Sequence, residues 1–317
     1  MGKLSRYLRL GPKVLLKKIV GYEEVYTVGI RLRGSSDDYR SIPRSEGYWY
    51  ADPLTFKYDD EWYLFTEAYD QEKCIGRIAV SLIGRNGSVS TPKIIISEDY
   101  HMSFPFVFDW RGGIYMIPET SDNNTINLFR CIHFPFDWKL EAQFHTSKPV
   151  VDTIVVEKND EKLELLGSVT NEEDPFYVSY QRYSIEIDGD KFSFKEGTCP
   201  INWNLKDRNA GKPFPLGEIC VVPTQESSQT HYGKQINFRK LGNDLIPENT
   251  TIVTLHTGNV HFGSSIKKEN VIGVHTYSQT DDFELVDLRY YKFSEDTNRR
   301  RIERLRNKKT REIRDDK

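Results

Sequence analysis

The sequence predicts an all-β protein, a five-bladed β-propeller with short, helical and basic extensions at its two ends. Aromatic residues make up 13% of the 317 residues, and short apolar runs alternate with turns rich in Gly, Asn and Asp. This pattern is typical of antiparallel strands. In addition, a strand-like core recurs five times, with starts separated by 52, 49, 56 and 52 residues. Such units correspond to the four-stranded blades of a propeller.

The repeated core is an apolar run of four residues that follows a charged or Gly-containing turn. A β-sandwich with periodic hairpins is the alternative fold, but regular spacing over five copies favours the propeller. We therefore expect a propeller over residues 46–293, a basic N-terminal extension with a lead-in strand over 1–45, and a basic helical tail over 294–317. The five cores are residues 62–65, 114–117, 163–166, 219–222 and 271–274.

Charge is segregated along the chain. Residues 1–20 carry six basic residues and no acidic residue, and residues 299–317 carry ten basic and four acidic residues. The body between them has 43 acidic against 28 basic residues. A nucleic-acid-binding domain would carry its positive charge on the fold itself, so this distribution argues against that class. Basic ends that also contain apolar residues suit an anionic membrane surface or a partner protein such as a glycosyltransferase.

The sequence indicates a cytoplasmic protein, peripheral at the inner face of the membrane. No apolar stretch reaches the ~18 residues of a membrane-spanning helix, and the apolar run at residues 14–16 is too short for a secretory signal. The four cysteines have neither the close pairing of a disulfide framework nor metal-ligand spacing. Glycine-rich nucleotide motifs and paired-cysteine zinc motifs are also missing from the sequence, so we expect no metal or other cofactor.

Polar residues fall at equivalent ends of the repeated strands, which is the main functional signal. In a propeller the innermost strand of each blade lines a central channel, and functional groups gather at one mouth. Closing the ring therefore brings together residues that are far apart in the chain. The residues at matched strand ends are Asp52, Glu67, Ser103, Glu119, Asp152, Ser168, Thr224 with Gln225, and Thr276 after His275; His101 and Arg208 lie near repeat boundaries.

These residues also have purely structural explanations. Asp52 and Glu119 are the favoured functional carboxylates, because carboxylates are seldom buried unless they are paired. The alternative for Asp52 is a hydrogen bond from a neighbouring backbone N–H group. His101 and His275 fit either a sugar hydroxyl or a hydrogen bond between blades. Arg208 fits either a substrate phosphate or a salt bridge between blades.

Several motifs resemble a known group of propellers. Residues 50–53 and 62–67 resemble the first blade of glycoside hydrolase family 43-like propellers. The body of the chain, about residues 46–293, is more similar to the N-terminal propeller of plant glucosamine inositolphosphorylceramide transferases and to its stand-alone bacterial relatives in surface-polysaccharide loci. The motifs that carry this similarity are residues 101–108, 113–119, 127–130, 208–211, 223–225 and 273–276.

The resemblance implies roles for the carboxylates. In hydrolytic members of family 43, a first-blade Asp is the base, a third-blade Asp tunes the acid, and a fourth-blade Glu is the acid. Asp52 and Asp152 match the first two positions. No Glu of the fourth repeat is in register, since Glu218 lies in the turn before a strand and Glu226 lies past the expected position. We expect Asp52 to act as base or electrostatic stabiliser, Glu119 as acid or hydroxyl ligand, and Asp152 as orienting partner. The substrate-binding candidates are Glu67, His101, Ser103, Arg208, Gln225 and His275.

Three functional hypotheses follow from the residues and the resemblance. The first is a carbohydrate-active protein of cell-surface polysaccharide or glycoconjugate biosynthesis, which transfers or modifies a sugar on a lipid-linked or nucleotide-activated substrate. The second is a non-catalytic propeller that binds glycan and recruits a glycosyltransferase. The third is a glycoside hydrolase, which the missing fourth-blade acid disfavours. Whether the protein is an enzyme stays open at this point.

Overall fold

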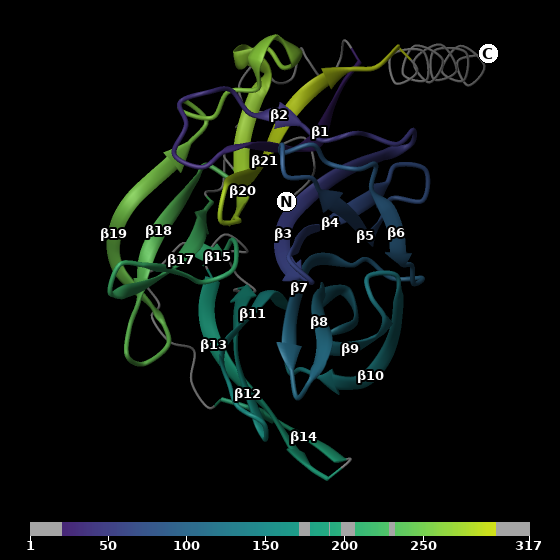
Figure 1. The fold of residues 1–317 in the computed structure, drawn as a ribbon, viewed down its shortest axis with the longest axis vertical. Coiled ribbons are helices and arrows are strands. Elements are labelled where there is room, and N and C mark those ends of the chain that lie inside the picture. Colours follow the sequence, from purple (N-terminus) through teal and green to yellow (C-terminus); the bar gives the residue numbers. More distant parts are fainter. Residues whose placement is uncertain (1–20, 171–177, 190, 198–206, 228–231, 296–317) are drawn as a thin grey trace, which may run out of the picture.

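A computed structural model describes residues 21–170, 178–189, 191–197, 207–227 and 232–295. These residues form five antiparallel sheets that stand around a central axis like the blades of a propeller (Figure 1). The all-β, five-bladed fold predicted from the repeats is therefore confirmed. Within this described part, no helix is long and apolar enough to cross a membrane.

Each blade is built of strands that follow one another from the channel outward, except in blade 5, where the two outer strands come from the beginning of the described chain. Blade 1 holds β3 (Tyr48–Tyr58), β4 (Glu61–Asp70), β5 (Ile75–Ile83) and β6 (Lys93–Ile96); blade 2 holds β7 (Ser103–Trp110), β8 (Gly113–Thr120), β9 (Thr125–His133) and β10 (Asp137–His145). Blade 3 holds β11 (Val150–Lys158), β12 (Lys162–Thr170), β13 (Val178–Asp188) and β14 (Lys191–Glu196). Blade 4 holds β15 (Asp207–Asn209), β16 (Phe214–Leu216), β17 (Ile219–Glu226), β18 (Gln235–Leu241) and β19 (Pro247–His256). Blade 5 holds β20 (Val271–Gln279), β21 (Phe283–Phe293), β1 (Tyr22–Leu32) and β2 (Arg40–Ser41).

The innermost strand of blade 4 is broken. Both β15 and β16 pair with β17, and residues 210–213 lie between the two short strands. Three short 3-10 helices, η1 (Ser121–Asn123), η2 (Gly263–Ser265) and η3 (Lys268–Asn270), lie in the connections.

Strands of the blades are covered on both faces, which explains their continuous apolar runs. Leu64 and Phe65 are neighbours on β4, so their side chains point to opposite faces of the sheet. Leu64 packs in a cluster with Val28 and Leu285 of blade 5, whereas Phe65 packs in another cluster with Met116 of blade 2. Both side chains are fully buried. Burying one side chain of this size contributes about 1.5–3 kcal/mol, so this packing between blades stabilises the ring.

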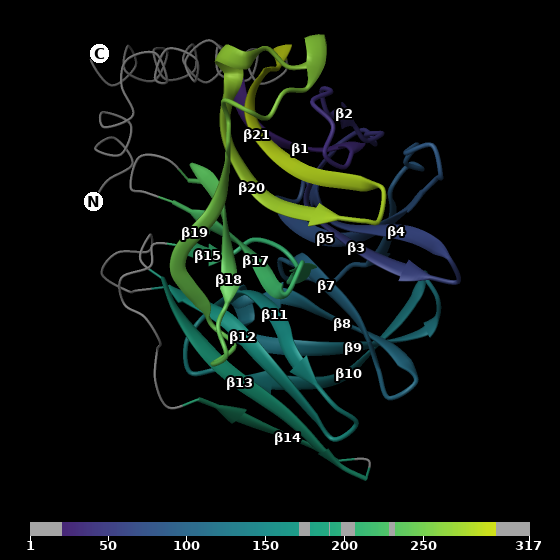
Figure 2. The same cartoon turned by 60° about the vertical axis from the view of Figure 1, so that its left-hand side comes forward.

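The two ends of the described chain meet in blade 5 and close the ring. Strand β1 pairs with β21 over its whole length of 11 residues, and Figure 2 shows the two strands side by side. Residues 1–45 are expected from the sequence to be an extension with a lead-in strand ahead of the propeller, whereas β1 and β2 are outer strands of the fifth blade. The physical reason is that β21 would otherwise present an unpaired edge. The helical extensions expected at residues 1–20 and from 296 onward lie outside the described residues.

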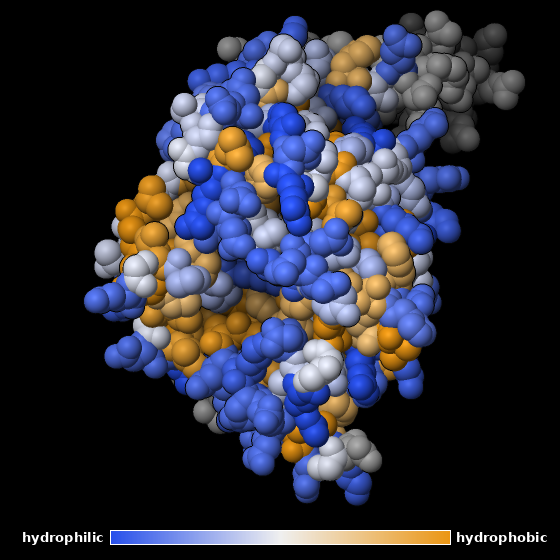
Figure 3. Space-filling model, viewed as in Figure 1, coloured by the Kyte–Doolittle hydropathy of each residue, from blue (hydrophilic) through white to orange (hydrophobic). Residues whose placement is uncertain are grey.

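The surface of the ring is uneven in polarity. The face shown in Figure 3 is mostly hydrophilic at its rim and has a hollowed area where hydrophobic residues gather. The channel has two distinct regions. One is a polar region in the first half of the innermost strands, and the other is an apolar pocket at their far end.

Candidate functional site

The innermost strands are bulged at equivalent positions, and these bulges build the site. The pairing of β3 with β4 shifts between Ala51 and Leu54, and the innermost strands of blades 2, 3 and 5 shift at the same place. The bulged residues Asp52, Phe104 and Asp152 have φ angles of 50°, 44° and 50°. Side chains other than glycine rarely adopt this left-handed region. Because a bulge removes backbone N–H groups from the ladder, each bulge needs a local hydrogen-bond acceptor.

Carboxylates supply these acceptors and join one blade to the next. Asp287 Oδ2 of blade 5 accepts the N–H of Asp52 at 3.0 Å. Asp52 Oδ2 accepts the N–H of Phe104 in blade 2 at 3.1 Å. Glu119 Oε2 of blade 2 accepts the N–H of Asp152 in blade 3 at 3.2 Å. The backbone hydrogen bond considered as the structural explanation of Asp52 is therefore present, and it is made between blades.

His275 lies between two buried carboxylates where blade 5 meets blade 1. Its Nδ1 is 3.0 Å from Asp52 Oδ1 and 3.2 Å from Asp287 Oδ2. Its Nε2 is 2.7 Å from the hydroxyl of Tyr232. Asp287 Oδ1 accepts the backbone N–H groups of His275 and Thr276, at 3.1 and 2.6 Å. The Thr276 hydroxyl donates to Asp52 Oδ1 at 2.7 Å. These contacts tie the three titratable groups into one cluster.

The cluster is an ion network. Burial alone would lower the pKa of His275, but the neighbouring phenol and the two carboxylates raise it well above the ordinary histidine value. Burial alone would raise the pKa of Asp52, but the charge of His275 and hydrogen bonds from His275 and Thr276 lower it. Asp52 is therefore an ionised carboxylate beside an imidazolium at neutral pH.

Among the described residues, Asp52, His275 and Asp287 form a cluster whose ligand atoms lie close enough together to hold a metal ion. The ligand atoms of Asp52, His275 and Asp287 lie within 4.8 Å of one another. However, Asp287 already has four hydrogen-bond donors on its two oxygens, from Asp52, from Thr276 and twice from His275. A carboxylate has about four lone-pair sites, and three of those on Asp287 accept backbone N–H groups. About one site is left, so a cation here would have to replace the His275 proton.

Glu67, on β4, is a buried carboxyl group with a free oxygen. It is 6% exposed, and its Oε1 makes no hydrogen bond. His101 Nε2 lies 3.5 Å from this oxygen, while His101 Nδ1 accepts the N–H of Gly76 at 2.9 Å. These contacts assign the imidazole proton to Nε2, on the side of Glu67. Burial lowers the pKa of His101, and burial together with the charge of Asp52 raises the pKa of Glu67 well above its usual value. Burial thus favours the neutral form of both Glu67 and His101.

The close approach of these groups depends on a glycine. A Cβ atom at Gly76 would lie 2.4 Å from the carbonyl oxygen of Met102 and 2.8 Å from Glu67 Oε1. No side chain fits in this space, so Gly76 permits the contact between β5 and the Glu67–His101 pair.

Glu119, on β8, is a second carboxyl group with a raised pKa. Burial and the charge of Asp152 raise this pKa to about 7, although Arg208 opposes the shift. Glu119 Oε1 accepts the hydroxyl of Ser121 at 2.8 Å, and Arg208 Nη2 lies 3.7 Å from Glu119 Oε2. Arg208 of blade 4 forms a two-point ion pair with Asp152 of blade 3, through Nε to Oδ2 and Nη2 to Oδ1. The salt bridge between blades, one of the two explanations of Arg208, is therefore present.

Half-buried aromatic side chains accompany these polar groups. Trp49 stacks on Tyr69, with ring centroids 4.3 Å apart and 9° between the planes. Tyr26 of β1 contacts Trp49 and His275, with centroid distances of 4.9 and 5.8 Å. Tyr69 also approaches His101, at 6.2 Å. Flat apolar faces next to hydrogen-bonding groups are what a sugar ring requires of a binding site.

The remaining predicted residues, Ser103 and Gln225, are also buried. Ser103 pairs with Glu119 across β7 and β8 and is 7% exposed. Gln225 is 1% exposed, and its amide donates to the hydroxyl of Ser227 at 2.6 Å. Both residues lie in the matched strands that the sequence assigns to the site. The Gln225 amide is engaged by Ser227, so Gln225 contributes to the shape and order of the site.

None of the three glutamates in the described part of blade 4 has the properties of a general acid, and Glu248 of β19 forms an exposed ion pair with Lys240 at 3.0 Å. Glu218 lies exposed in the turn between β16 and β17. Glu226 pairs with Lys234 and Gln235, each at 2.8 Å. Although burial raises the pKa of Glu226, hydrogen bonds from Lys234 and Asn237 lower it overall. The acid expected from the hydrolytic members of family 43 has no counterpart in the described part of blade 4.

Three residues of the site, Asp287, Tyr26 and Tyr232, are not predicted from the sequence. Asp287 stands alone in the apolar run 285–288, and a single carboxylate within a buried strand was the signal that a paired charge was needed there. Tyr26 comes from β1, which was not assigned to a blade. Tyr232 lies beneath the guanidinium groups of Arg208 and Arg289, 5.6 and 5.5 Å from its ring centroid. No local pattern reveals these contacts, because they depend on ring closure.

Comparison with known proteins places the chain in a family. Residues 41–250 match the family model described as glucosamine inositolphosphorylceramide transferase 1, N-terminal. The chain belongs to this family. The matched range contains Asp52, Glu67, Glu119 and Asp152, whereas Asp287 lies beyond it.

Two plant proteins illustrate the extent of the similarity. The chain is 38% identical over 107 residues to glucosamine inositolphosphorylceramide transferase 1 of Arabidopsis thaliana, covering 33% of this chain and 14% of that protein. It is 31% identical over 218 residues to the protein of the same name from Oryza sativa subsp. japonica, covering 63% of this chain and 28% of that protein. The similarity therefore spans less than a third of the length of these relatives.

Solved structures share the propeller at low sequence identity. The catalytic domain of a Coprinopsis cinerea GH62 α-L-arabinofuranosidase superposes with a TM-score of 0.53 and 12% identity, covering 83% of this chain and 97% of that domain. An exo-β-1,3-galactanase of Phanerochaete chrysosporium in complex with galactose superposes with a TM-score of 0.50 and 12% identity, covering 67% of this chain and 52% of that one. At these identities the similarity shows the fold alone.

Proposed function

We propose that this protein is a carbohydrate-active propeller of cell-surface polysaccharide or glycoconjugate biosynthesis, and that it transfers or modifies a sugar at the bulged end of the channel. The observation that carries the proposal is a set of carboxyl groups in one place with opposite pKa shifts. The pKa of Asp52 is lowered, that of Glu119 is raised to about 7, and that of Glu67 is raised well above its usual value. Neighbouring titratable groups with separated pKa values mark an acid and its counterpart.

The two kinds of carboxyl group suit the two requirements of glycosyl chemistry. Bond cleavage or transfer at a sugar carbon builds positive charge there and moves a proton at an oxygen. Glu119, with a pKa of about 7, holds or gives up a proton near neutral pH and fits proton exchange with a hydroxyl or leaving oxygen. Asp52 stays ionised and supplies a fixed negative charge. Because Asp52 is 2% exposed and fully hydrogen-bonded, we assign it electrostatic stabilisation in preference to proton abstraction.

Substrate recognition is assigned to the groups around this pair. The Glu67 oxygen without a partner accepts or donates a hydroxyl hydrogen bond, and His101 Nε2–H lies beside it. Trp49 and Tyr69 offer stacked rings for a sugar face. The family name refers to a transferase with a sugar and a phosphorylated lipid among its reactants, which agrees with a lipid-linked or nucleotide-activated substrate.

A non-catalytic, glycan-binding role is the second candidate, and a specific observation favours it. Asp52, Asp152 and Asp287 each accept hydrogen bonds or ion pairs that join blades, which is sufficient reason for their presence. In this version the propeller binds glycan and recruits a glycosyltransferase. Glu67 and Glu119 would then bind hydroxyl groups without proton transfer.

Two substitutions separate these candidates. We would prepare Asp52→Asn and Glu119→Gln, with Glu218→Gln as the matched control, because Glu218 is an exposed carboxylate of the same fold. Glycan affinity and sugar transfer would be measured against a panel of nucleotide sugars and oligosaccharides, with circular dichroism to confirm folding. Loss of transfer with affinity retained supports the enzyme, and unchanged biological output without measurable transfer supports the scaffold. If both folded variants keep wild-type transfer and affinity, the site is wrong.

We also propose that the basic ends hold the protein at the inner face of a membrane or on a glycosyltransferase. Each Lys or Arg near an anionic bilayer contributes about 1 kcal/mol, and residues 1–20 alone carry six. Deleting residues 1–20 and 296–317 should abolish co-sedimentation with vesicles that contain anionic lipid. Binding that is unchanged by both deletions would rule out the membrane version.

A further inference from the structure

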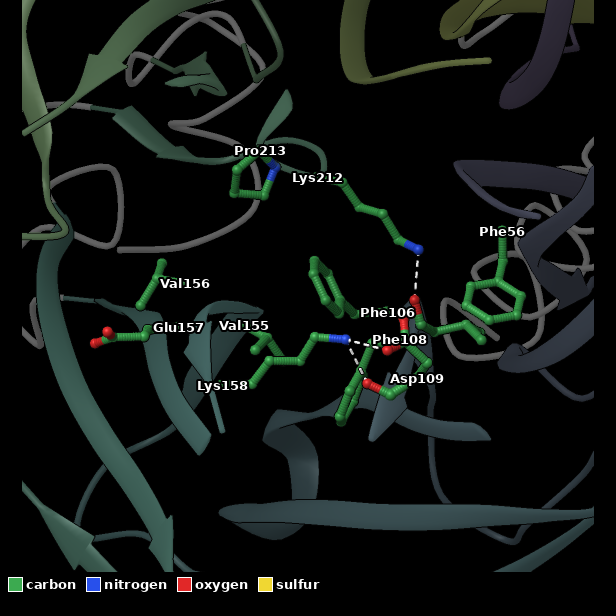
Figure 4. A pocket seen from close by; sticks show the side chains of 11 residues that line it. Phe56, Phe106, Phe108, Asp109, Val155, Val156, Glu157, Lys158, Lys212 and Pro213 are labelled. Carbon is green, nitrogen blue, oxygen red and sulfur yellow. Dashed lines mark hydrogen bonds and ion pairs between the residues drawn. The ribbon is translucent and has the colours of Figure 1, made fainter. Parts of the chain in front are cut away.

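A separate pocket lies at the far end of the channel from the bulges. Asp52 and Asp152 lie in the first half of β3 and β11, whereas the pocket is lined by residues of the second half of β3, β7 and β11. Its volume is about 350 Å³, within the ~300–1,000 Å³ of small-molecule sites. The lining residues are Phe56, Phe106, Val107, Phe108, Asp109, Val155, Val156, Glu157, Lys158, Lys212 and Pro213, most of them labelled in Figure 4.

Lys212 crosses the channel at this end. It belongs to the segment that interrupts the innermost strand of blade 4, and Figure 4 shows its side chain extended toward Phe56. Its ammonium group donates to the carbonyl oxygens of Thr55, at 2.8 Å, and Val107, at 2.5 Å. The rings of Phe56 and Phe106 lie 5.4 and 5.1 Å from Nζ. All of these partners are neutral, and among the described residues no carboxylate lies within ion-pair distance of Lys212.

The other charges that face the pocket do not neutralise Lys212. Asp109 of β7 forms an ion pair with Lys158 of β11. The Lys158 Nζ lies 2.6 Å from Asp109 Oδ2 and 2.5 Å from the carbonyl oxygen of Asp109. Glu157 lies exposed at the rim. Burial lowers the pKa of Lys212 to about 7, although Asp109 raises it slightly. Burying a cation without a counterion is unfavourable, so an anion that entered the pocket would relieve this cost.

We propose that this pocket binds a monosaccharide-sized anion, whose carboxylate or phosphate pairs with Lys212 and whose ring packs against Phe106 and Phe108. The remaining N–H of the ammonium group is available for the anion, since two of its three donors are used. The aromatic wall provides the apolar contact that a ring needs. The site is independent of the proposed sugar-processing site, because the two share no residue.

The charge state of Lys212 makes the binding dependent on pH. At pH 6 most of the amine is protonated and competent to bind an anion, whereas at pH 8 about a tenth is protonated. Since apparent affinity scales with the competent fraction, it falls about tenfold between pH 6 and pH 8. Binding near pH 7 is accompanied by proton uptake.

Isothermal titration calorimetry on the full chain tests the proposal. The probes are glucuronate and glucose 1-phosphate, with glucose as the neutral control. Binding of only one of the two anions would show whether Lys212 recognises a carboxylate or a phosphate group. We expect binding of at least one anion, weak or no binding of glucose, and an affinity at pH 6 about tenfold above that at pH 8. Titrations of the wild-type protein in buffers of different ionisation enthalpy measure the proton uptake. This test needs no variant, so it remains valid even if a variant fails to fold.

Substitutions assign the binding to this pocket. Lys212→Met keeps a long side chain without charge and should reduce anion affinity at least tenfold, whereas Lys139→Met, at an exposed lysine of β10, should not change it. Glu119→Gln should leave anion affinity unchanged, which separates this site from the proposed sugar-processing site. The proposal is overturned if neither anion binds at millimolar concentration, if glucose binds equally well, or if folded Lys212→Met binds as the wild type does.

Discussion

The two ends of the channel are built from the same innermost strands but differ in what their backbone requires. In the first half of the strands, the bulges at Asp52, Phe104 and Asp152 leave N–H groups that carboxylates must satisfy. In the second half, residues such as Phe56 and Phe108 lie in regular ladders, so their side chains are free to be apolar. The comparison shows that a local backbone irregularity, repeated in the blades, concentrates charge at one end of a propeller.

The charges at the two ends also differ in how they are compensated. At the bulged end, His275 lies between Asp52 and Asp287 and compensates part of their charge through short contacts. At the far end, all the hydrogen-bond partners of Lys212 among the described residues are neutral carbonyl groups. Removing a charge should therefore destabilise the first end and stabilise the second.

Asp287→Ala should cause the largest loss of stability. It removes the acceptor of four hydrogen bonds and leaves His275 with one counterion fewer in a buried site. Breaking a buried ion pair from one side costs about 3–5 kcal/mol. Urea denaturation measures the change in unfolding free energy, with Asp281→Ala as control because Asp281 forms an exposed ion pair and should lose less than about 1 kcal/mol. A loss below 1 kcal/mol for Asp287→Ala would contradict the network.

Glu119→Gln should change how stability depends on pH. The ordinary pKa of this glutamate is 4.5 and its folded value is about 7, so the folded protein holds a proton that the unfolded chain has released between these values. Stability therefore falls as pH rises through this window. In the variant the fall between pH 5 and pH 7.5 should be smaller, by on the order of 2 kcal/mol. Urea titrations at the two pH values measure this; parallel curves for the two proteins would show that Glu119 is ionised in the fold.

Lys212→Met should raise stability, in contrast to Asp287→Ala. The pKa of Lys212 falls from 10.5 to about 7 on folding, so the burial cost is greatest below pH 7 and disappears as pH rises toward 10.5. At pH 6 we expect a gain of about 1–2 kcal/mol, reduced by the two lost hydrogen bonds to carbonyl groups. Thermal unfolding at pH 6 and pH 9.5 measures the gain and its decline. A variant that is less stable at pH 6 would mean that the carbonyl contacts outweigh the burial of charge.

Lys158→Met should have the smallest effect. Its ion pair with Asp109 lies at the surface, with the two side chains 36% and 77% exposed. Exposed pairs of this kind contribute about 0–1 kcal/mol. Denaturation in low and high salt would show the expected small difference, and a loss above 2 kcal/mol would indicate that Lys158 is needed to order the pocket.

The sequence was sufficient to predict the parts of the molecule that repeat. The five strand cores predict the blades, and in the structure Asp52, Glu119 and Asp152 lie at one end of the channel. The exact placement differs, because these residues lie at or beside bulges within strands, and bulges leave no periodic pattern in the sequence.

The features that depend on contacts far apart in the chain could not be predicted. Tyr26 reaches the site because β1 pairs with β21, which joins residues more than 250 positions apart, and Asp287 reaches Asp52 because blade 5 meets blade 1. Lys212 reaches the far end because the innermost strand of blade 4 is interrupted there. Neither event has a local signature, since strand pairing and strand interruption are decided by the closed ring.

The location of a bound glycan shows directly whether the bulged end is the sugar-processing site. The measurement is a crystal structure of the protein with the neutral oligosaccharide that binds best in a screen, because a neutral ligand avoids the attraction of Lys212. We expect a sugar ring on Trp49 and Tyr69, with hydroxyl groups on Glu67 and Glu119. An oligosaccharide bound in the Phe56–Phe108 pocket, or on the outer strands of a blade, with the bulged end empty, would contradict it.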